Sequence, residues 1–227
     1  MKKIFLAIAV TIFFVSAYGQ KISKVSINKD GTFEMFSLLL DENVTMTMSD
    51  EGAIKEWGFE VYSDRIPSMS RLEAYGGRVE YYSQYDNEAF RGKVKYIGKT
   101  LITYYASYDI ESLRGKVKSI GQAAVGFYSK YENELLSGKI KNVGPVNFDW
   151  YTSYDNESFK GKLKSVGSTP LTYYASYDDK IIKGRIKSID RAMFTYYLST
   201  EKKEYQGAVK SGSQLQTING IKYYVRF

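Results

Sequence analysis

The chain has 227 residues, of which 44% are hydrophobic and 16% aromatic, and it contains no cysteine and no histidine. These two absences exclude disulfides, thiolate nucleophiles, Ser-His-Asp triads and metal sites built from His or Cys. The 32 Lys and Arg residues exceed the 25 Asp and Glu residues by seven, which is too small and too dispersed an excess to predict nucleic-acid binding.

Residues 1–19 have the pattern of a secretory signal peptide. Lys2 and Lys3 precede the apolar run "IFLAIAVTIFFVSA", and the small residues Ala17 and Gly19 follow the A-x-A form. The run is shorter than the roughly 20 residues that a membrane helix needs. We therefore expect cleavage before Gln20 and export to the periplasm, the cell surface or the medium.

Residues 20–69 form an irregular N-terminal region that we expect to fold as capping hairpins. "KVSINKDGTFEMFSLLL" has an Asp30-Gly31 turn between alternating segments, and "NVTMTMSDEGAIKEWGFEVYS" repeats that form around Glu51-Gly52. Terminal parts of repeat arrays are usually atypical because they cover the end or face of the array.

Residues 70–210 form an array with a period of 23 residues, marked by Gly92, Gly115, Gly138, Gly161, Gly184 and Gly207. Each unit has the form G-K-[VIL]-K-x-[IV]-G followed by [YFW]-Y-x-x-Y-[DE], alternates with period two and is rich in Tyr, Val, Ile and Thr. This pattern predicts two antiparallel strands per unit. We place eight-residue strands at 113–120 and 124–131, a turn at 121–123 and an outer turn at 132–135.

This register predicts an apolar face and a polar face on the repeat sheet. Val117, Val125 and Phe127 fall on the apolar face, whereas Lys116, Lys118 and Tyr128 fall on the other. Tyrosines at the strand ends are expected to face aliphatic or aromatic partners. These pairs are Tyr108–Leu113, Tyr131–Leu136, Tyr154–Phe159 and Tyr177–Ile182.

The expected fold is all-β: an antiparallel meander of tandem hairpins in a curled or twisted sheet, closed by a C-terminal hairpin at 211–227 around Asn219-Gly220. A parallel solenoid would stack each lysine on its copy about 4.8 Å away, so it is disfavoured, and a propeller finds no support in the unit-to-unit similarities. Twist accumulates over many strands, so we expect the sheet to curl with its apolar face inside and partly covered by the N-terminal hairpins. Strands of about eight residues are too short to cross a bilayer, so we expect no membrane span after cleavage.

The 23-residue, glycine-punctuated and tyrosine-bearing hairpin resembles MORN repeats in length and rhythm over roughly residues 70–210. The leader together with the "GKLKSVG…TYYASYD" units also resembles tyrosine-rich repeat proteins secreted by Bacteroidota, whose function is unassigned. The additional glycines of MORN repeats are missing. The resemblance therefore implies an architecture and an exported location, and it carries over no functional residue.

One candidate binding surface emerges from the repeat: a ribbon of aromatic rings and cations on the polar face. It could stack on and pair with an extended ligand, or it could simply cover a thin sheet through cation–π contacts. Its tentative binding residues are Tyr105, Tyr128, Tyr151, Tyr174 and Tyr197 together with Lys95, Lys118, Lys141, Lys164 and Lys187.

The acidic residues after each second tyrosine predict turn caps, because one D-x-E turn supplies too few oxygens for calcium and an active site needs one differentiated carboxylate pair. These residues are Asp86, Asp109, Glu132, Asp155 and Asp178. Departures from the repeat occur at Trp150, Asp149 and Asp190, and Trp57 lies outside the array. A core aromatic such as Trp150 is more often packing than recognition.

These patterns lead to one functional hypothesis and one alternative. The hypothesis is an exported, non-enzymatic β-repeat protein with a structural or adhesive role at the cell envelope, binding an envelope protein or an anionic polysaccharide without any cofactor or metal. The alternative is a carbohydrate-binding module for an extended envelope polysaccharide.

Overall fold

The computed structural model describes residues 20–62 and 70–227, so the expected signal peptide at 1–19 lies outside the described residues. A seven-stranded sheet has the order β19-β20-β1-β2-β3-β4-β5 and is antiparallel except where β1 pairs with β20 in parallel. Its strands are β1 (Lys21–Asn28), β2 (Phe33–Leu39), β3 (Thr45–Met48), β4 (Ile54–Tyr62), β5 (Ser70–Ala74), β19 (Leu215–Ile218) and β20 (Ile221–Arg226).

The repeats form an eleven-stranded antiparallel meander that runs in chain order from β6 to β16, followed by the separate pair β17–β18. Its strands are β6 (Val79–Tyr81), β7 (Val94–Ile97), β8 (Thr100–Tyr104), β9 (Val117–Ile120), β10 (Ala123–Phe127), β11 (Ile140–Val143), β12 (Val146–Trp150), β13 (Leu163–Val166), β14 (Thr169–Tyr173), β15 (Ile186–Ile189) and β16 (Ala192–Met193), with β17 (Thr195–Tyr196) and β18 (Val209–Ser211) beyond them. The predicted all-β antiparallel meander is confirmed.

Helical structure within the described ranges is limited to short 3₁₀ turns: η1 (Asp41–Asn43), η2 (Glu111–Leu113) and η3 (Glu134–Leu136). None of the helical segments that the structure describes has the length and apolar character needed to cross a membrane.

The prediction of eight-residue strands is wrong: β9 has four residues and β10 has five. The recurring Gly-Lys pair ends each strand early. Gly115 N–H donates to the Tyr105 carbonyl at 2.8 Å, and Tyr105 N–H donates to the Lys116 carbonyl at 2.9 Å. Gly115 and Lys116 therefore both lie opposite Tyr105. With φ of +71° at Gly115, this is the geometry of a G1 β-bulge. A long outer loop between Tyr105 and Lys116 stands in place of the predicted four-residue turn.

The turns at the opposite ends of the hairpins contain two residues rather than the predicted three. Ile120 pairs with Ala123, which leaves Gly121 and Gln122 as the turn, and Gly121 has φ of +54°. A positive φ at the first turn position is typical of type II′ turns and favours glycine there. Asp190 takes this position in the last full turn at φ of +50°, so the unit keeps the backbone geometry at a steric cost.

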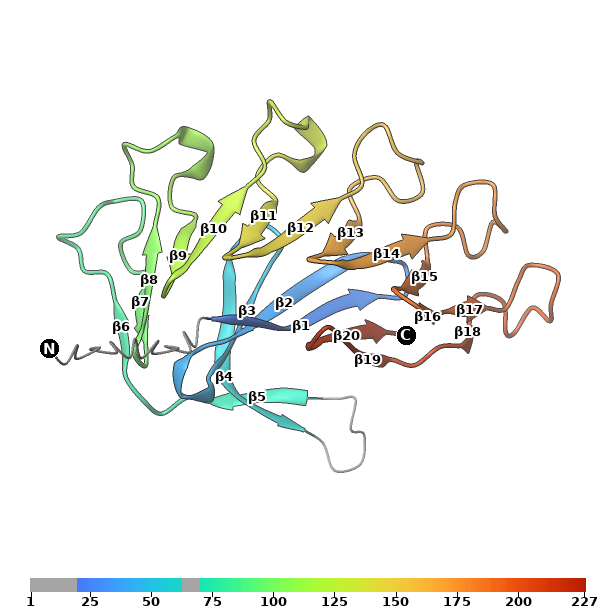
Figure 1. Ribbon diagram of the computed structural model, residues 1–227, viewed down its shortest axis with the longest axis horizontal. Coiled ribbons are helices and arrows are strands. Elements are labelled where there is room, and N and C mark those ends of the chain that lie inside the picture. Colours follow the sequence, from blue (N-terminus) through green and yellow to red (C-terminus); the bar gives the residue numbers. More distant parts are fainter. Residues whose placement is uncertain (1–19, 63–69) are drawn as a thin grey trace, which may run out of the picture.

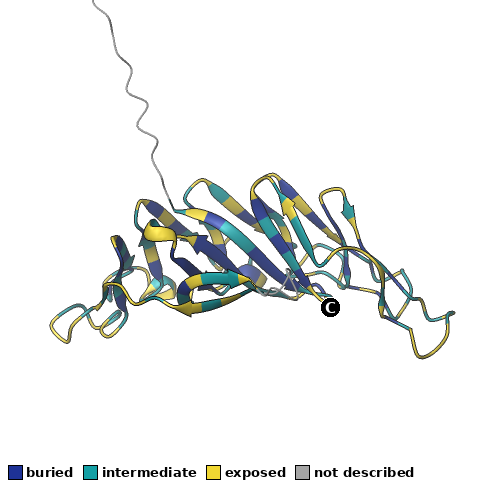
Figure 2. Cartoon of the chain, turned by 90° about the horizontal axis from the view of Figure 1, so that it is seen from below, coloured by how far each residue is buried: buried dark blue, intermediate teal, exposed yellow. Residues whose placement is uncertain are grey.

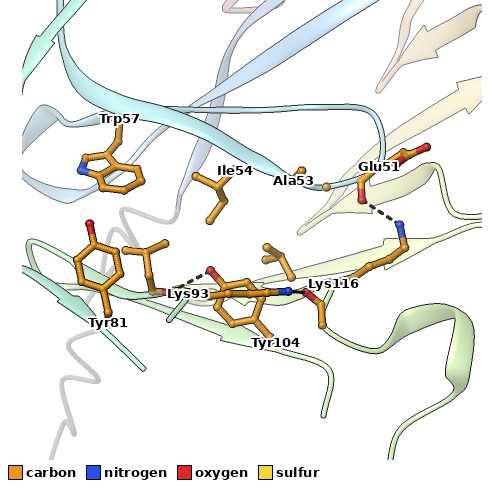
Figure 3. A pocket seen from close by; sticks show the side chains of 12 residues that line it. Glu51, Ala53, Ile54, Trp57, Tyr81, Lys93, Tyr104 and Lys116 are labelled. Atoms are coloured by element: carbon orange, nitrogen blue, oxygen red, sulfur yellow. Dashed lines mark hydrogen bonds between the residues drawn. The ribbon is translucent and has the colours of Figure 1, made fainter. Parts of the chain in front are cut away.

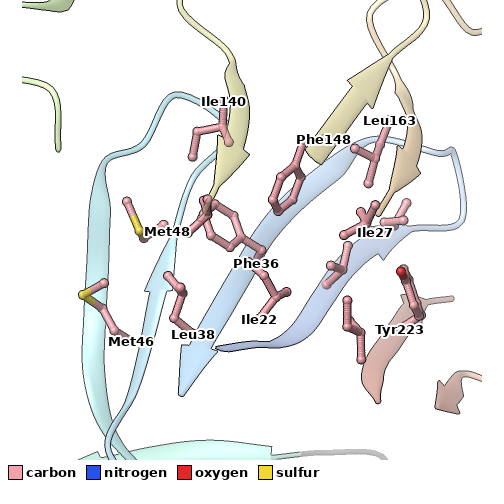
Figure 4. Packing of buried hydrophobic residues seen from close by; sticks show 14 of the residues in the cluster. Ile22, Ile27, Phe36, Leu38, Met46, Met48, Ile140, Phe148, Leu163 and Tyr223 are labelled. Carbon is pink, nitrogen blue, oxygen red and sulfur yellow. The ribbon is translucent and has the colours of Figure 1, made fainter. Parts of the chain in front are cut away.

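The core lies between the two sheets, with the meander curved around β1–β4 (Figure 1). Phe36 of β2 packs on Phe148 of β12 at 5.0 Å between ring centroids, and Phe33 packs on Trp150 at 5.4 Å. Side chains of β1–β3 face those of β11–β13 across this interface (Figure 4). Val117 and Trp150 are buried as expected. The curled sheet with its apolar face under the N-terminal hairpins is thus confirmed.

Along each hairpin of the meander, burial differs between the strands and the outer loops. Buried residues concentrate in the strands, and exposed ones concentrate in the loops that project away from the N-terminal sheet (Figure 2). The C-terminal hairpin completes the N-terminal sheet, since β20 pairs with β1 and the ring of Phe227 meets that of Phe194 at 6.1 Å. The strands therefore supply most of the buried core, and the exposed parts of the outer loops face away from it.

Asp190→Gly should stabilise the protein by about 0.5–1 kcal/mol, because it removes the left-handed strain of a side-chain-bearing residue while adding the smaller entropic cost of glycine. Urea unfolding of the two proteins measures this difference. Gly167→Asp, at the equivalent turn one unit earlier with φ of +55°, is the reverse control and should destabilise by a similar amount. Equal stability of all three proteins would contradict the strain argument.

Candidate functional site

The predicted lysine–tyrosine ribbon is present, and its members contact one another. Lys118 lies 5.4 Å from the Tyr105 ring centroid, Lys141 lies 5.5 Å from Tyr128, and the pairs Lys164–Tyr151 and Lys187–Tyr174 repeat this contact at 5.4 Å. The remaining two members pair outside the predicted set: Lys95 lies over Tyr82 and Lys210 over Tyr197, both at 5.3 Å.

The hydroxyls of this ribbon are used within the fold. Four of the five donate to a backbone carbonyl 20 residues further along: Tyr105 to Val125 at 3.4 Å, Tyr128 to Phe148 at 3.3 Å, Tyr151 to Leu171 at 3.0 Å and Tyr174 to Phe194 at 2.9 Å. Burial, with a smaller contribution from Asp149, raises the pKa of Tyr128 to about 12, so its phenol stays a neutral donor. These half-buried tyrosines tie one unit to the next.

Lys116 is not on the ribbon side, and its predicted face is therefore corrected. The β-bulge rotates it toward the apolar face, where its Nζ lies 5.0 Å from the Phe127 ring centroid and donates to the Gly138 carbonyl at 3.1 Å. The same cation–ring pair recurs in five successive units and forms what we name the inner ladder. Its rungs are Lys93–Tyr104, Lys116–Phe127, Lys139–Trp150, Lys162–Tyr173 and Arg185–Tyr196.

The second tyrosine of each unit is almost fully exposed, which contradicts the predicted strand-end pairs. Leu136 is only 2% exposed, whereas Tyr131, its predicted partner, is 89% exposed. The aliphatic or aromatic residue packs instead under the ribbon, as Phe159 does against Tyr151 at 4.6 Å between ring centroids. The exposed tyrosines are Tyr85, Tyr108, Tyr131, Tyr154 and Tyr177, at between 84% and 94%.

Acidic caps hold these exposed tyrosines in place, as the sequence predicted. The Asp109 carboxylate accepts the Ala106 N–H at 2.6 Å, and Asp155 accepts both the N–H and the hydroxyl of Thr152. Hydrogen bonds from Thr152 lower the pKa of Asp155, so the cap is charged at neutral pH. The [DE] that follows each second tyrosine was therefore the sequence signal that this tyrosine lies in a capped loop and not in a strand.

Neighbouring outer loops (82–93, 105–116, 128–139, 151–162, 174–185 and 197–208) are also tied together. Asn87 donates to the Ser107 hydroxyl at 3.0 Å, Asn156 to Ser176 at 2.9 Å, and Ser199 donates to Asp179 at 2.6 Å. At one junction both partners differ, because Ile110 and Lys130 occupy the Asn and Ser positions. Ile110 is 71% exposed. The loops thus form a spaced row with one looser junction.

Clefts lie between these loops and recur with the repeat. One cleft of about 400 Å³ is lined by residues that include Tyr128, Glu132 and Lys164. A second, of about 740 Å³, is lined by Tyr174, Asp178 and Lys210, each 46 residues further along. Each cleft therefore combines a tyrosine of the ribbon, an acidic cap and a lysine, and we refer to them as the interloop clefts.

A separate charged cluster lies on the N-terminal sheet around Glu60. Burial alone would raise the pKa of this carboxyl, but hydrogen bonds from Lys24, Ser70 and Tyr62 outweigh that effect and hold the pKa at about 2. A general acid would need a pKa near the working pH. This carboxylate is instead a charged partner of Lys24 at 2.8 Å, which suits stabilisation of the sheet.

The comparisons with known proteins add no template: no protein-family model, no curated protein and no solved structure matches the chain. Function is therefore inferred from the geometry of the outer loops, the lysine–tyrosine ribbon and the inner ladder.

Glu60→Gln should weaken the protein at neutral pH and should matter little below pH 2. The pKa of Glu60 in the folded protein lies below the 4.5 of an unperturbed glutamate, so its contribution to stability is complete above about pH 4.5 and disappears as the pH falls through 2. Unfolding free energies from urea titrations between pH 7 and pH 2 test this. If wild type and variant lose stability in parallel across that window, Glu60 is not the source of the dependence.

Proposed function

We propose that the protein is an exported, non-enzymatic binding protein with a structural or adhesive role at the cell envelope, and that its row of outer loops is the binding surface. The observation that carries this proposal is the set of five tyrosines, one per unit, at between 84% and 94% exposure. Tyrosine supplies a large amphipathic contact area at a low cost in conformational entropy, and it is enriched at binding hot spots.

The rigidity of the loops supports the same role. Each loop is closed by a β-bulge, capped by an acidic side chain such as Asp109 and, at most junctions, bonded to its neighbour. A surface that is ordered before binding loses less entropy when a partner arrives. The loops therefore present their rings in a fixed, repeated arrangement, which favours an extended partner with many contact points.

The lysine–tyrosine ribbon has a secondary place in this proposal. Its rings are half-buried and covered by lysines, which makes them poor stacking platforms, but the lysines border the interloop clefts. Lys164 and Lys210 can pair there with anionic groups of a ligand held by the exposed tyrosines. We therefore propose that the second tyrosine of each unit makes the main aromatic contacts with the ligand. The ribbon tyrosines, which the sequence suggested for this role, are Tyr105, Tyr128, Tyr151, Tyr174 and Tyr197.

A carbohydrate-binding module for an extended envelope polysaccharide remains the second proposal, supported by the recurrence of the interloop cleft. Equivalent clefts two units apart offer the same tyrosine, acid and lysine. A polymer with a repeating unit could occupy several of them at once, and the linked contacts would raise its avidity.

The triple variant Tyr108→Ser/Tyr131→Ser/Tyr154→Ser should lose binding at least tenfold while keeping its melting temperature, because these side chains are exposed and pack on little. Binding is measured for the mature chain on a glycan array and on immobilised peptidoglycan fragments, and by crosslinking in an envelope extract. Signal on the first two supports the polysaccharide, and signal on the third alone supports a protein partner.

Phe59→Ser, which changes a part-exposed aromatic on β4, is the matched control and should leave binding unchanged. Retention of full binding by the triple variant on every surface that wild type binds would contradict the assignment of the outer loops.

A further inference from the structure

The first N-terminal hairpin turn docks onto the inner ladder through three contacts. The Lys29 carbonyl accepts the backbone N–H of Ile186 at 3.3 Å, and the Asp30 carbonyl accepts from Lys162 Nζ at 2.5 Å. Gly31, at φ of +78°, lies against the Tyr173 ring so closely that a Cβ there would be 2.6 Å from it. The turn is thus bound by a cation, an aromatic ring and a main-chain N–H, those of Lys162, Tyr173 and Ile186, and we call such a set of three groups a socket.

The second hairpin turn docks in the same way, two repeat units earlier. The Asp50 carbonyl accepts the N–H of Ile140 at 2.6 Å, and the Glu51 carbonyl accepts from Lys116 Nζ at 3.1 Å. Gly52, at φ of +79°, lies against the Phe127 ring. Every receiving residue is 46 positions from its counterpart, so the repeat presents one type of socket and the chain fills two of them.

A third socket of this type is made by Lys93, Tyr104 and Val117, and it opens into a pocket of about 410 Å³. Among the described residues, Lys93 Nζ contacts the Gly115 carbonyl and the Tyr104 ring. Residues Glu51, Gly52 and Ala53 of the second turn line one side of the same pocket, but no carbonyl of a described N-terminal turn accepts from Lys93 Nζ or from the Val117 N–H. Burial lowers the pKa of both Lys93 and Lys116, but at Lys116 the acids Glu51 and Asp50 oppose the shift. No acid of the described ranges has the same effect on Lys93.

The pocket has room for a turn because the N-terminal sheet is incomplete at this point. β5 pairs with β4 only from Gly58 onward, so no β5 residue pairs with Ile54 or Trp57. Trp57 and Ile54 form one wall, and Tyr81, Lys93 and Tyr104 form the opposite wall (Figure 3). The rung at Trp150, by contrast, is closed by Phe33 and by the ion pair of Lys139 with Asp50.

We propose that this third socket binds a β-turn of another protein, in which an acidic residue is followed by glycine. Its two carbonyls would accept from Lys93 Nζ and the Val117 N–H, and its glycine would lie on the Tyr104 ring, as in the two filled sockets. The Asp30-Gly31 and Glu51-Gly52 turns of this chain are both already docked. The partner is therefore a different protein and not a second copy.

The probe for this site is a head-to-tail cyclised hairpin peptide containing residues 25–36 of this chain, with a Gly31→Val peptide as its matched control. Trp57 in the pocket wall reports binding to the full chain by fluorescence, and calorimetry gives the affinity. The wild-type peptide should bind with one-to-one stoichiometry. The Gly31→Val peptide should bind at least tenfold more weakly, because its side chain would collide with the ring.

Two protein variants test whether the peptide binds in this pocket. Lys93→Met removes the charged donor, and Tyr81→Ser changes a wall residue that is 55% exposed; each should weaken peptide binding about tenfold. Equal affinity for both peptides, or unchanged affinity in both protein variants, would overturn the proposal, as would concentration-dependent dimers that the peptide dissociates. The triple tyrosine variant of the outer loops should bind the peptide normally, so the two proposals fail independently.

Discussion

The docking of two glycine turns onto the inner ladder is the interaction on which the shape of this protein depends. The meander has a continuous apolar face, and a face of that size cannot stay exposed to water without association. The turns at Gly31 and Gly52 anchor the N-terminal hairpins across that face, and Phe36 then packs on Phe148 beneath them. Each anchor is specific because only a residue without a side chain fits between the turn backbone and the ring.

In each repeat unit, the strands form the core and the outer loop carries the exposed tyrosine. A β-bulge at Gly115-Lys116 closes the outer loop, and the strands on either side have only four or five residues. The core therefore remains one thin layer closed by the N-terminal sheet. The rest of each unit is an outer loop with an acidic cap, a small aliphatic or aromatic core and one exposed ring. Since neighbouring units contact mainly each other, the loops can vary with little effect on the fold, as Ile110 and Lys130 do.

Much of the fold could be predicted from the sequence because the 23-residue period and the two-residue alternation both act locally. They gave the antiparallel meander, the buried side of Val117 and the N-terminal cover. The loop structure could not be predicted in the same way, because the bulge at Gly115 rotates Lys116 to the opposite face and the Asp109 cap turns Tyr108 outward. The sockets depend on contacts such as Asp50–Ile140, between residues 90 positions apart, which no local pattern reveals.

The most direct test compares Gly52→Ala with Gly92→Ala by urea unfolding. Both glycines have positive φ, +79° and +72°, but a Cβ at Gly52 would meet the Phe127 ring at 2.7 Å, whereas a Cβ at Gly92 meets nothing within 4 Å. Backbone strain should cost both variants about 1–2 kcal/mol. If turn docking holds the sheets together, Gly52→Ala should lose about 1–3 kcal/mol more. Equal losses in the two variants would contradict this account.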